Sequence, residues 1–437
     1  MLHQIIKHTQ RNLHSTSRNI IRNRQKYLAP SLRTFEAYDT PFILSRGDKY
    51  NLWDEQNNKY IDLLGQNLCV SVGYGNRKVI DAATAQMNKL SHCTTMYYNE
   101  QSANLAKEIT ELLPKRDDGE DWVVHLVNDG SEAVDLAVQM ARVYTGRPEF
   151  YSLHKAYHGL HGYAAGLTAI GKSTQESYSS MFSSIRHVCA NDIESLRNSI
   201  LYGTGGNVAG IIIEPLQGFG GIHALKDGYM KDTFELVKKA GGVTIADEVQ
   251  TGYGRCGESF WGFQMKNNDV VPDMITIAKG MGNGVGIIGA VVSKRSIAEA
   301  FTDKMFFNTY GANPMSSAAA RAVIKVMKED KIMENCNEQG KLFKKELTKL
   351  CHKYPDVYTD ARGTGLFQGL EIYGNTPEVS QQNAYMLHKE LLKYGVIAGR
   401  GSAQGNVFRI QPPMCITTDA VNTVVDALDN LANDTRL

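Results

Sequence analysis

The chain has 437 residues, of which 42% are hydrophobic and 21% charged, and its formal net charge is +1 at pH 7. This composition excludes a collagen-like, coiled-coil or wholly disordered protein, and no run approaches the roughly 18 apolar residues of a membrane-spanning helix. The seven cysteines include no Cys-x-x-Cys pair, which argues against a disulfide framework or a zinc site. We therefore expect a protein of a reducing compartment with no metal site and no membrane partner.

The first 35 residues carry seven basic and no acidic side chains, which leaves a formal charge of −6 on the rest of the chain. Hydroxyl residues at 15–17 and apolar residues spaced along one helix face complete the pattern of a mitochondrial transit peptide. A solvated basic arm or nucleic-acid tail is the alternative, but the mildly acidic remainder argues against nucleic acid as a partner. We expect residues 1–30 to be a transit peptide or a disordered basic arm, and the protein to act in the mitochondrial matrix.

Residues 36–70 alternate polar and apolar positions, which is typical of antiparallel hairpins. From about residue 120, short apolar runs alternate with helical patterns, which predicts a mostly parallel sheet with helices on both faces. The predicted strands are 123–127, 210–213, 243–246, 274–278 and 289–292. The predicted helices include 131–144 and 228–240, and the second ends at a Gly-Gly pair.

The part after residue 315 begins with a long helical pattern and ends in mixed strands and helices. Together with the N-terminal hairpins it can form a smaller α+β domain built from both ends of the chain. The predicted organisation is a leader or arm at 1–30, the first part of the small domain at 31–75, a large ligand-binding domain at 76–315 and the rest of the small domain at 316–437.

Two charged residues stand directly after predicted strands. Asp247 follows the strand at 243–246, and Lys279 follows the strand at 274–278. Because ligands bind beyond the carboxyl ends of parallel strands, we expect these two side chains to meet in one crevice. A structural ion pair is one interpretation. The other is a Schiff-base lysine with a carboxylate that binds a pyridinium nitrogen.

A third strand end turns into a helix through Asn128-Asp129-Gly130-Ser131. The free backbone N–H groups of the first helical turn and the Ser131 hydroxyl can bind a phosphate, although ordinary helix capping by Asp129 or Ser131 is the alternative. Further on, Tyr157 in Tyr157-His158-Gly159 offers an aromatic face on which a flat heterocycle can stack.

Five blocks extend this pattern along the chain: Asp-Gly-Ser-Glu-Ala at 129–133, Tyr-His-Gly at 157–159, Glu-Pro-Leu-Gln-Gly at 214–218, Ala-Asp-Glu-Val-Gln-Thr-Gly-Tyr-Gly-Arg at 246–255 and Ala-Lys-Gly at 278–280. In this order they resemble the class III pyridoxal-phosphate aminotransferases, over nearly the whole chain after residue 36. Blocks at 260–264, 308–314 and 399–417 resemble the mitochondrial alanine–glyoxylate subfamily. The resemblance implies fold type I of the pyridoxal-phosphate transferases, an α/β fold with a smaller α+β domain.

The resemblance also implies a role for each site residue. Lys279 binds pyridoxal phosphate covalently and later moves the transferred proton, and Asp247 keeps the pyridine nitrogen protonated. The other cofactor-binding candidates are Gly130 and Ser131 at the phosphate, Tyr157 and Val249 on the two faces of the ring, Gln250 at the phenolate oxygen, and His158 and Glu214. Thr309 reaches the phosphate of the neighbouring subunit, so the resemblance implies a homodimer or homotetramer with shared active sites.

Arg409 is the candidate for the substrate carboxylate, because a guanidinium binds a carboxylate through two parallel hydrogen bonds. A surface arginine is the alternative. Relatives that use a distal amine carry a glutamate that masks this arginine, where the chain has Phe219. We therefore expect a ping-pong transfer of the amino group of L-alanine, or a similar small amino acid, to glyoxylate or pyruvate. Asn67, in a pocket wall that is more polar than such an enzyme predicts, is a further substrate-binding candidate.

Two other segments depart from the family pattern. Gly73-Tyr74-Gly75-Asn76-Arg77 replaces a Gly-His-x-His-Pro block, and 171–187 is shorter than the usual insertion. Both are expected at the substrate entrance, so alternatives remain open. These are an ω-amino or β-amino acid aminotransferase, an aminomutase or decarboxylase on the same scaffold, and a catalytically silent binding protein.

Two further motifs lack their required context. Residues 284–289 fit the Gly-x-Gly-x-x-Gly dinucleotide fingerprint but lead into a strand-like run instead of a helix, so we expect no nicotinamide site. His154, His158 and His161 have helical metal-ligand spacing, but no glutamate follows His154, so we expect no zinc hydrolase.

Overall fold

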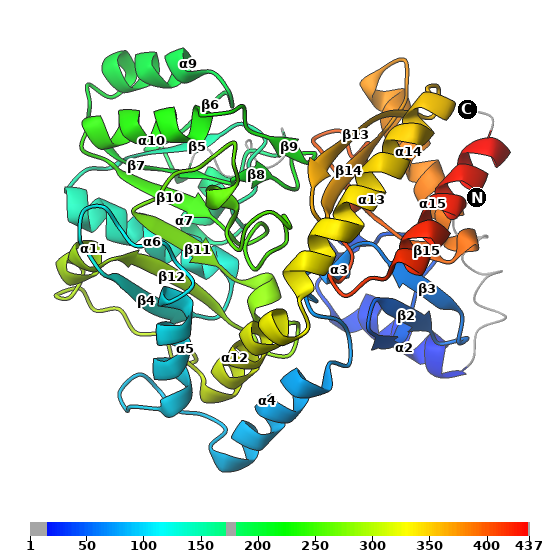
Figure 1. Cartoon of the computed structure of the whole chain (residues 1–437), viewed down its shortest axis with the longest axis horizontal. Helices are drawn as coiled ribbons and strands as arrows, with labels where there is room; N and C mark the ends of the chain where they lie inside the picture. Colours follow the sequence, from blue (N-terminus) through cyan, green and yellow to red (C-terminus); the bar gives the residue numbers. More distant parts are fainter. Residues whose placement is uncertain (1–14, 172–180, 436–437) are drawn as a thin grey trace.

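The largest sheet in the computed structural model, which describes residues 15–171 and 181–435, has seven strands (Figure 1). In spatial order these are β4 (Trp122–Val127), β12 (Gly289–Lys294), β11 (Met274–Ile277), β10 (Val243–Asp247), β7 (Val208–Ile213), β5 (Glu149–Leu153) and β6 (Ile185–Val188). The neighbours from β11 to β6 pair in parallel, and β12 runs antiparallel to both its neighbours. The expected mostly parallel sheet is confirmed.

The large sheet is buried on both faces, which explains why its strands are continuous apolar runs. In β7, Ile211 and Ile213 belong to the hydrophobic cluster on one face, whereas Ile212 belongs to the cluster on the other. Helices α9 (Ile193–Asn198) and α10 (Tyr229–Lys239) cover the first face, and α6 (Gly130–Thr145), α7 (Gly162–Leu167) and α11 (Arg295–Ala300) cover the second. Because both faces are covered, a ligand can reach this sheet only at the ends of its strands.

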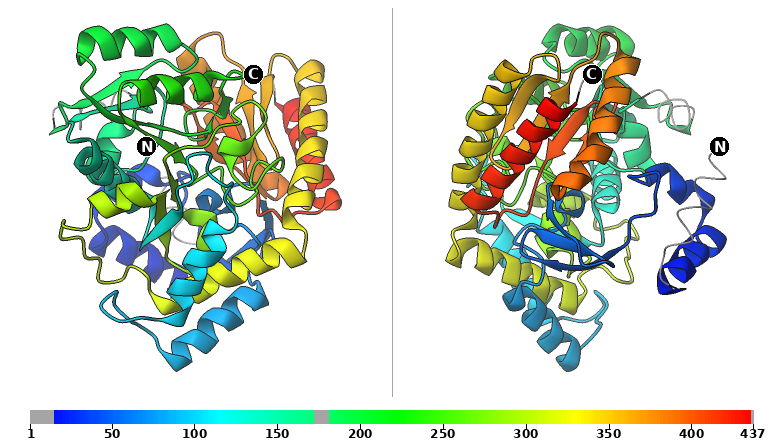
Figure 2. Two further views of the ribbon diagram at one scale, coloured as in Figure 1. Left: turned by 60° about the vertical axis from the view of Figure 1, so that its left-hand side comes forward. Right: turned by 90° about the vertical axis from the view of Figure 1, so that its right-hand side faces the viewer.

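Strands from both ends of the chain share a smaller sheet, as expected. The meander of β1 (Leu44–Asp48), β2 (Asn51–Asp54) and β3 (Lys59–Asp62) pairs with β15 (Val396–Ile397), which is parallel to β3. Another four-stranded sheet consists of β13 (Tyr358–Thr364), β14 (Phe367–Ile372), β17 (Val407–Ile410) and β16 (Gly399–Gly401). Helices α13 (Ile332–Lys353), α15 (Thr418–Asp434) and α14 (Pro377–Leu391) lie side by side over it (Figure 2). The exact domain boundaries remain a prediction.

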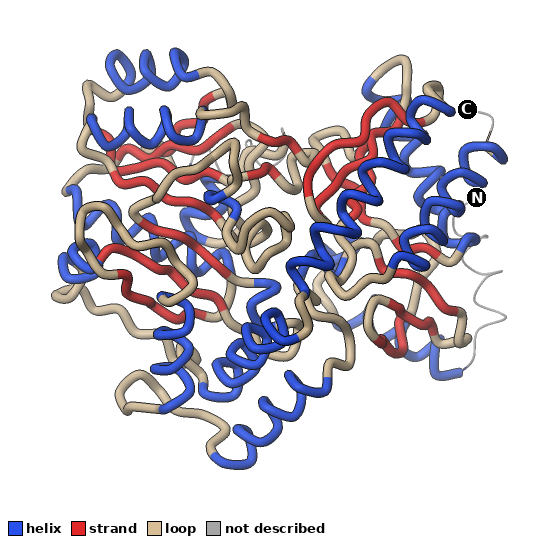
Figure 3. Tube along the Cα trace, in the orientation of Figure 1, coloured by secondary structure: helices blue, strands red, loops and turns tan. Residues whose placement is uncertain are grey.

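The large sheet and the smaller sheets form two groups of strands, with loops between them (Figure 3). Helices α4 (Arg77–Lys89) and α5 (Glu100–Thr110) pack against α12 (Pro314–Glu329), which leads from the large sheet to α13. The short elements are η2 (Pro30–Phe35), α3 (Gly65–Leu68), η4 (Ser199–Gly203), β8 (Leu216–Gln217), β9 (His223–Ala224), η5 (Gly262–Gln264), η6 (Lys279–Gly282) and η7 (Leu392–Tyr394). Of these, α3 and η6 bear directly on the site described below.

Part of the expected transit peptide, residues 1–14, lies outside the described residues. The described remainder includes α2 (Ser15–Tyr27), where the Ser17 hydroxyl bonds to Glu55 and the Arg24 guanidinium pairs with Glu36. The transit-peptide interpretation stays a prediction. Across 15–171 and 181–435, no helix combines the length and hydrophobicity that crossing a bilayer requires.

Four of the predicted strands extend one or two residues beyond their predicted bounds, and two further differences have a physical reason. The strand predicted at 274–278 ends at Ile277, because Ala278 leaves the strand geometry and Lys279 takes a φ of +45°. Strands β5 and β6 were not among the predicted runs. Their sequences, Glu-Phe-Tyr-Ser-Leu and Ile-Arg-His-Val, mix polar with apolar residues, and β6 is an edge strand whose first three residues are only partly buried.

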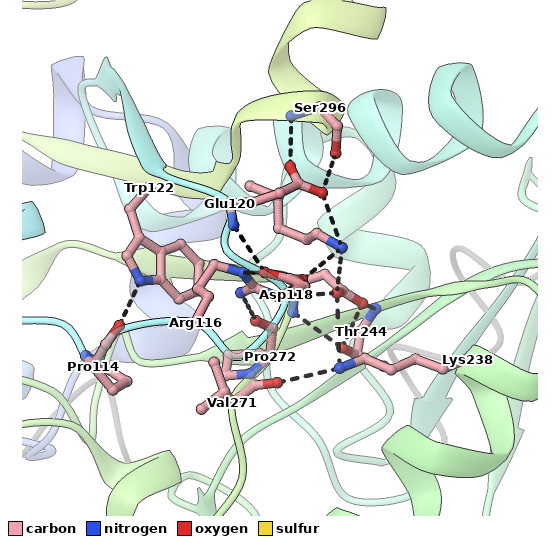
Figure 4. Close-up of polar contacts among 12 residues, drawn as sticks. Pro114, Arg116, Asp118, Glu120, Trp122, Lys238, Thr244, Val271, Pro272 and Ser296 are labelled. Carbon is pink, nitrogen blue, oxygen red and sulfur yellow. Dashed lines mark hydrogen bonds and ion pairs between the residues drawn. The ribbon is translucent and has the colours of Figure 1, made fainter.

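An ion-pair network occupies the edge of the large sheet where β10 and β11 begin (Figure 4). Its members are Arg116, Asp118, Glu120, Lys238, Asp273 and Lys294. Asp273 lies 3.6, 3.7 and 3.6 Å from Arg116, Lys238 and Lys294. It also accepts hydrogen bonds from the Thr244 N–H and hydroxyl, at 3.0 and 2.8 Å. The carboxylate of Asp273 is therefore fully satisfied.

Candidate active site

The opposite edge of the sheet, where β10 and β11 end, opens into a cavity of about 340 Å³. Asp247 is the last residue of β10, and Lys279 comes one residue after Ala278, the residue that follows β11. The predicted site residues that line this cavity are Gly130, Ser131, Tyr157, His158, Asp247, Val249 and Lys279. The crevice expected beyond the strand ends is therefore present.

Asp247 is buried, with 4% of its surface exposed, and is held by three neighbours. Its Oδ2 lies 2.7 Å from Nδ1 of His158. Its Oδ1 accepts hydrogen bonds from the Val249 N–H at 3.1 Å and from the hydroxyl of Thr276, its partner on β11, at 3.2 Å. Nε2 of His158 is buried and has no hydrogen-bond partner among the described residues. A carboxylate fixed in this way can stabilise a cationic group that enters the cavity.

Lys279 combines an unusual backbone with a free amine. Its φ of +45° is left-handed, and at a lysine this costs on the order of 1 kcal/mol, a strain typical of functional sites. Its Nζ lies 5.9 Å from the centre of the Tyr157 ring and, in the described ranges, forms no hydrogen bond or ion pair. Burial lowers the pKa of Lys279, while the charge of Asp247 acts in the opposite direction. The structural ion pair is therefore not formed, and a lowered pKa suits a nucleophilic amine.

The first turn of α6 provides an anion site. Asp129 caps the helix, since its Oδ1 accepts a hydrogen bond from the Glu132 N–H at 2.9 Å. In the part of the chain that is described, the N–H groups of Gly130 and Ser131 have no acceptor. Gly159 packs against Ser131 with a φ of +118°, and a Cβ there would lie 2.3 Å from the Ser131 hydroxyl oxygen. Free N–H groups at a helix N-terminus bind phosphate well.

Glu214 and Gln250 lie behind the cavity lining. The Glu214 carboxylate accepts hydrogen bonds from the N–H groups of Tyr157 and Gly218, each at 2.9 Å, and burial raises the pKa of Glu214 to about 7. Glu214 therefore positions Tyr157. Oε1 of Gln250 is buried and has no partner within the described residues. Because an unpaired buried polar atom costs roughly 1–3 kcal/mol, Gln250 points to a ligand that this side chain can bind.

Arg409, on β17, is buried with 3% of its surface exposed, so the surface-arginine alternative is wrong. Its Nε donates to Oε1 of Gln411 at 3.0 Å, and its NH1 lies 3.4 Å from Oδ1 of Asn67. The guanidinium lies 5.5 Å from the centre of the Phe219 ring, which lies 5.5 Å from that of Tyr157. No carboxylate of the described residues forms an ion pair with Arg409, and burial lowers its pKa to about 10. A buried cation of this kind is suited to an anionic ligand.

Like Asn67, Glu214, Gln250 and Arg409, Thr309 is a predicted site residue that does not line the cavity. It is exposed and is not part of the lining. Its neighbour Asn308 bonds to Asn128 at 2.9 Å and to Glu132, which ties this loop to the start of α6. The role of Thr309 across a subunit interface stays a prediction.

Several contact residues were not predicted from the sequence. Thr276 bonds to Asp247, Gln411 orients Arg409, and Cys69, His161 and Ile287 line the cavity. Two of them had a usable signal. Thr276 is the parallel-strand partner of Asp247, and Gln411 stands two residues after Arg409, directly beyond the end of β17. Residues separated by two along an extended chain face the same side.

Comparisons with known proteins agree on the family. The family described as Aminotransferase class-III matches residues 35–431. Alanine–glyoxylate aminotransferase 2 homolog 2, mitochondrial, of Arabidopsis thaliana is 36% identical over 427 residues, covering 94% of this chain and 86% of that protein. Ethanolamine-phosphate phospho-lyase homolog 1 of Caenorhabditis elegans is 30% identical, covering 94% and 92%. The crystal structure of a transaminase from the marine bacterium Virgibacillus has a TM-score of 0.85 at 26% identity, covering 94% and 97%.

Proposed function

Because the chain belongs to the class III aminotransferases, we propose that it moves the amino group of L-alanine, or of a similar small amino acid, to glyoxylate or pyruvate. The observation that supports this most is Arg409, a buried cation without a carboxylate partner in the described residues. It lies beside the Phe219 ring, where members that use a distal amine carry a masking glutamate. An unmasked guanidinium binds the carboxylate of an α-amino acid.

The cofactor of the family is pyridoxal phosphate, and the unpaired polar groups of the cavity fit it. The free N–H groups of Gly130 and Ser131 suit the phosphate. Tyr157 and Val249, both in the lining, are assigned to the two faces of the ring. The Gln250 side chain, which lies behind the lining, is assigned to the phenolate oxygen as a donor through its amide NH2 group. Asp247 is assigned to the pyridine nitrogen, with His158 and Glu214 holding Asp247 and Tyr157 in place.

When bound, pyridoxal phosphate withdraws electrons from the substrate Cα and so makes its proton removable. Asp247 keeps a proton on the pyridine nitrogen, because a fixed carboxylate stabilises the positive charge that this proton brings. Lys279 binds the cofactor through Nζ and, once its amine is free, removes the Cα proton of the amino acid. Its burial favours the neutral amine that both tasks require.

Arg409 and Asn67 are both assigned to the recognition of the substrate carboxylate. The guanidinium supplies two parallel donors, and the Asn67 amide keeps the guanidinium in one orientation. The amino acid and the keto acid then occupy this position in turn, which is the basis of a ping-pong mechanism. Phe219 restricts the space next to Arg409 and so favours a short side chain.

We also propose that the protein is a homodimer or homotetramer. Two adjoining loops expose large apolar side chains, and such patches mark interfaces between proteins. The loops are joined by a hydrogen bond from Asn99 to the Ala312 carbonyl and by contact of the His92 and Tyr310 rings. The exposed side chains are Met96, Tyr97, Tyr98, Met305, Phe307 and Tyr310. An interface here places Thr309 next to a second copy of the chain.

A mitochondrial location is part of the same proposal. The basic, acid-free first 35 residues and the names of the relatives, which include the word mitochondrial, support it. Import of the full chain into isolated mitochondria, with loss of its first residues on mass spectrometry, is the expected outcome. A chain that stays outside and uncut would contradict the proposal.

The proposed reaction is tested by identifying products. Enzyme loaded with pyridoxal phosphate and given L-alanine and glyoxylate is expected to form pyruvate and glycine in equal amounts. Turnover of β-alanine, γ-aminobutyrate or ornithine in place of L-alanine would favour an ω-amino or β-amino acid aminotransferase. Phosphate released from phosphoethanolamine without a keto acid would indicate a lyase, since Arg409 can also bind a phosphate. Failure to bind the cofactor would indicate a silent relative.

A further inference from the structure

Four consecutive residues next to the cavity, Gly65–Leu68, have a left-handed backbone, with φ values of 54°, 48°, 56° and 66°. Three of them are not glycine, and each such residue costs on the order of 1 kcal/mol. The turn closes through a hydrogen bond of 3.0 Å from the Leu68 N–H to the Leu64 carbonyl. At Gly65 a Cβ would lie 2.9 Å from the carbonyl oxygen of Gln411. A turn of this kind persists only if its surroundings hold it.

Asp62, the fully buried last residue of β3, holds the start of this turn. Its Oδ1 accepts hydrogen bonds from the N–H groups of Leu64 and Gly65, at 2.8 and 3.0 Å. Its Oδ2 accepts a hydrogen bond of 2.5 Å from the hydroxyl of Tyr74. Tyr74 is itself fixed, because its ring packs on Gly47, where a Cβ would lie 2.7 Å from the ring. Tyr74 also belongs to the segment in which this chain departs from the family pattern.

The chain that follows the turn is bonded to the loop after Lys279. The Ser71 hydroxyl donates to the Gly280 carbonyl at 2.7 Å. The Asn283 side chain accepts from the Val72 N–H and donates to the Gly73 carbonyl, both at 2.9 Å. These contacts fix the position of residues 71–73 relative to the lysine.

The turn itself contacts Arg409. Asn67, its third residue, places Oδ1 at 3.4 Å from NH1 of Arg409, and Gln411 approaches both Gly65 and Arg409. One continuous segment therefore connects Lys279, which is proposed to bind the cofactor and remove the Cα proton, with Arg409, which is proposed to bind the carboxylate. In an α-amino acid a single carbon separates these two groups, so the spacing between Lys279 and Arg409 decides which substrates fit.

We propose that Asp62 and Tyr74 are positioning residues for the amino-acid substrate. They hold the left-handed turn so that Asn67 fixes Arg409 at the spacing from Lys279 that an α-amino acid requires. This selects α-amino acids against β-amino acids, whose carboxylate is one carbon further from the amine. The proposal rests on the proposed aminotransferase function, since it concerns the carboxylate position of that same site.

The substitution Tyr74→Phe tests the proposal, because it removes only the hydroxyl that donates to Asp62. Tyr50→Phe is the matched control. Tyr50 lies in the β1–β2 hairpin on which Tyr74 packs, and its hydroxyl bonds to Thr417 and not to the left-handed turn. In the holoenzyme, Tyr74→Phe is expected to raise KM for L-alanine about tenfold, with kcat changed less than about threefold and the cofactor absorbance retained. The preference for L-alanine over β-alanine is expected to fall. Tyr74→His, whose imidazole can donate a hydrogen bond to Asp62, is expected to restore part of the wild-type KM for L-alanine and part of the preference for L-alanine over β-alanine.

Hydrogen exchange provides a readout that is independent of turnover. Peptides covering 62–74 are expected to exchange faster in Tyr74→Phe than in the wild type or in Tyr50→Phe. The proposal is wrong if Tyr74→Phe keeps the wild-type KM, preference and exchange. It is also wrong if cofactor binding and kcat fall together with no change in preference, because that result indicates a purely structural role.

Two further measurements keep the test decisive. If Tyr74→Phe does not fold, Asn67→Ala replaces it, since Asn67 is exposed. An unchanged KM for L-alanine in Asn67→Ala would overturn the proposal.

If the wild type does not use L-alanine, the proposed function fails, and the carboxylate position is tested with two reagents that react with the bound cofactor. Aminooxyacetate carries a carboxylate and O-methylhydroxylamine does not. Tyr74→Phe is expected to slow the bleaching of the cofactor absorbance by aminooxyacetate about tenfold more than the bleaching by O-methylhydroxylamine. Equal slowing with the two reagents would overturn the proposal.

Discussion

The two edges of the large sheet are built from the same strands but differ in how their polar groups are paired. Where β10 and β11 begin, Asp273 contacts three cations and accepts two hydrogen bonds (Figure 4). Where they end, the Lys279 amine lies over the Tyr157 ring and forms no hydrogen bond or ion pair within the described residues. Nε2 of His158 and Oε1 of Gln250 are buried there without a hydrogen-bond partner among those residues. Unpaired buried groups cost free energy of folding, so the second edge is less stable than it could be. The difference separates the edge whose paired groups stabilise the fold from the edge that is proposed to bind the cofactor.

The largest effect is expected from Lys279→Ala. Loss of the amine removes the group proposed to bind the cofactor and to move the Cα proton, so kcat is expected to fall about 10⁴-fold or more. The thermal midpoint of the cofactor-free protein is expected to stay close to that of the wild type, because Nζ forms no hydrogen bond or ion pair in the described residues. Near-normal turnover in this variant would contradict the assignment of Lys279.

Asp247→Asn and Asp273→Asn apply one substitution to the two edges. In Asp247→Asn the side-chain shape remains, but the charge proposed to keep the pyridine nitrogen protonated is lost, so kcat is expected to fall about 10³-fold. The denaturation midpoint is expected to change little. Steady-state kinetics and urea denaturation of the same preparation check both expectations, and a wild-type kcat would remove Asp247 from the mechanism.

Asp273→Asn is expected to show the reverse behaviour. It leaves Arg116, Lys238 and Lys294 without their shared carboxylate, and breaking a buried ion pair costs about 3 kcal/mol of unfolding free energy. Turnover at saturating substrate is expected to remain within about twofold of the wild type. If Asp273→Asn lowered kcat without lowering stability, the division between the two edges would be wrong.

Arg409→Lys extends the comparison to the position proposed for the substrate carboxylate. Lysine keeps the positive charge but cannot form two parallel hydrogen bonds, so KM for L-alanine is expected to rise about 30-fold with a smaller change in kcat. Titration with a carboxylate inhibitor gives the same information without turnover. Equal KM values for the variant and the wild type would place the carboxylate elsewhere.

The smallest effect concerns acid stability at the ion-pair network. The hydrogen bond from Arg116 holds the pKa of Asp118 below its usual value of 3.8, although burial acts in the opposite direction. A carboxylate with a lowered folded-state pKa contributes stability above pH 3.8, and this contribution is lost as the pH falls below that value. The wild type is therefore expected to be more stable than Asp118→Asn at neutral pH. Denaturation midpoints at several pH values are expected to converge below pH 3.8, and a constant difference would contradict this.

The strands and the main chemical residues were predictable because both follow from local sequence. Apolar runs of four to six residues predict buried strands, and Asp247 and Lys279 stand at the ends of two of them. Position after a parallel strand is enough to bring two side chains to one crevice. The strands β5 and β6 escaped prediction because their polar residues interrupt the apolar pattern.

Contacts between distant residues were not predictable in this way. His158 and Asp247 are 89 residues apart in sequence, and Asn67 and Arg409 are 342 apart. No periodicity records which of these side chains meet. The left-handed turn at Gly65–Leu68 was equally hidden, because Gln66, Asn67 and Leu68 are not the glycines that signal such a backbone. The tertiary contacts of Asp62 hold a conformation that local propensity does not favour.

The most direct measurement is the visible absorbance of the purified protein, loaded with pyridoxal phosphate, before and after addition of L-alanine alone. An aminotransferase that accepts L-alanine is expected to lose its yellow band when L-alanine is added and to regain it when glyoxylate follows. A yellow band that L-alanine does not change would contradict the proposed donor and the assignment of Arg409 to its carboxylate.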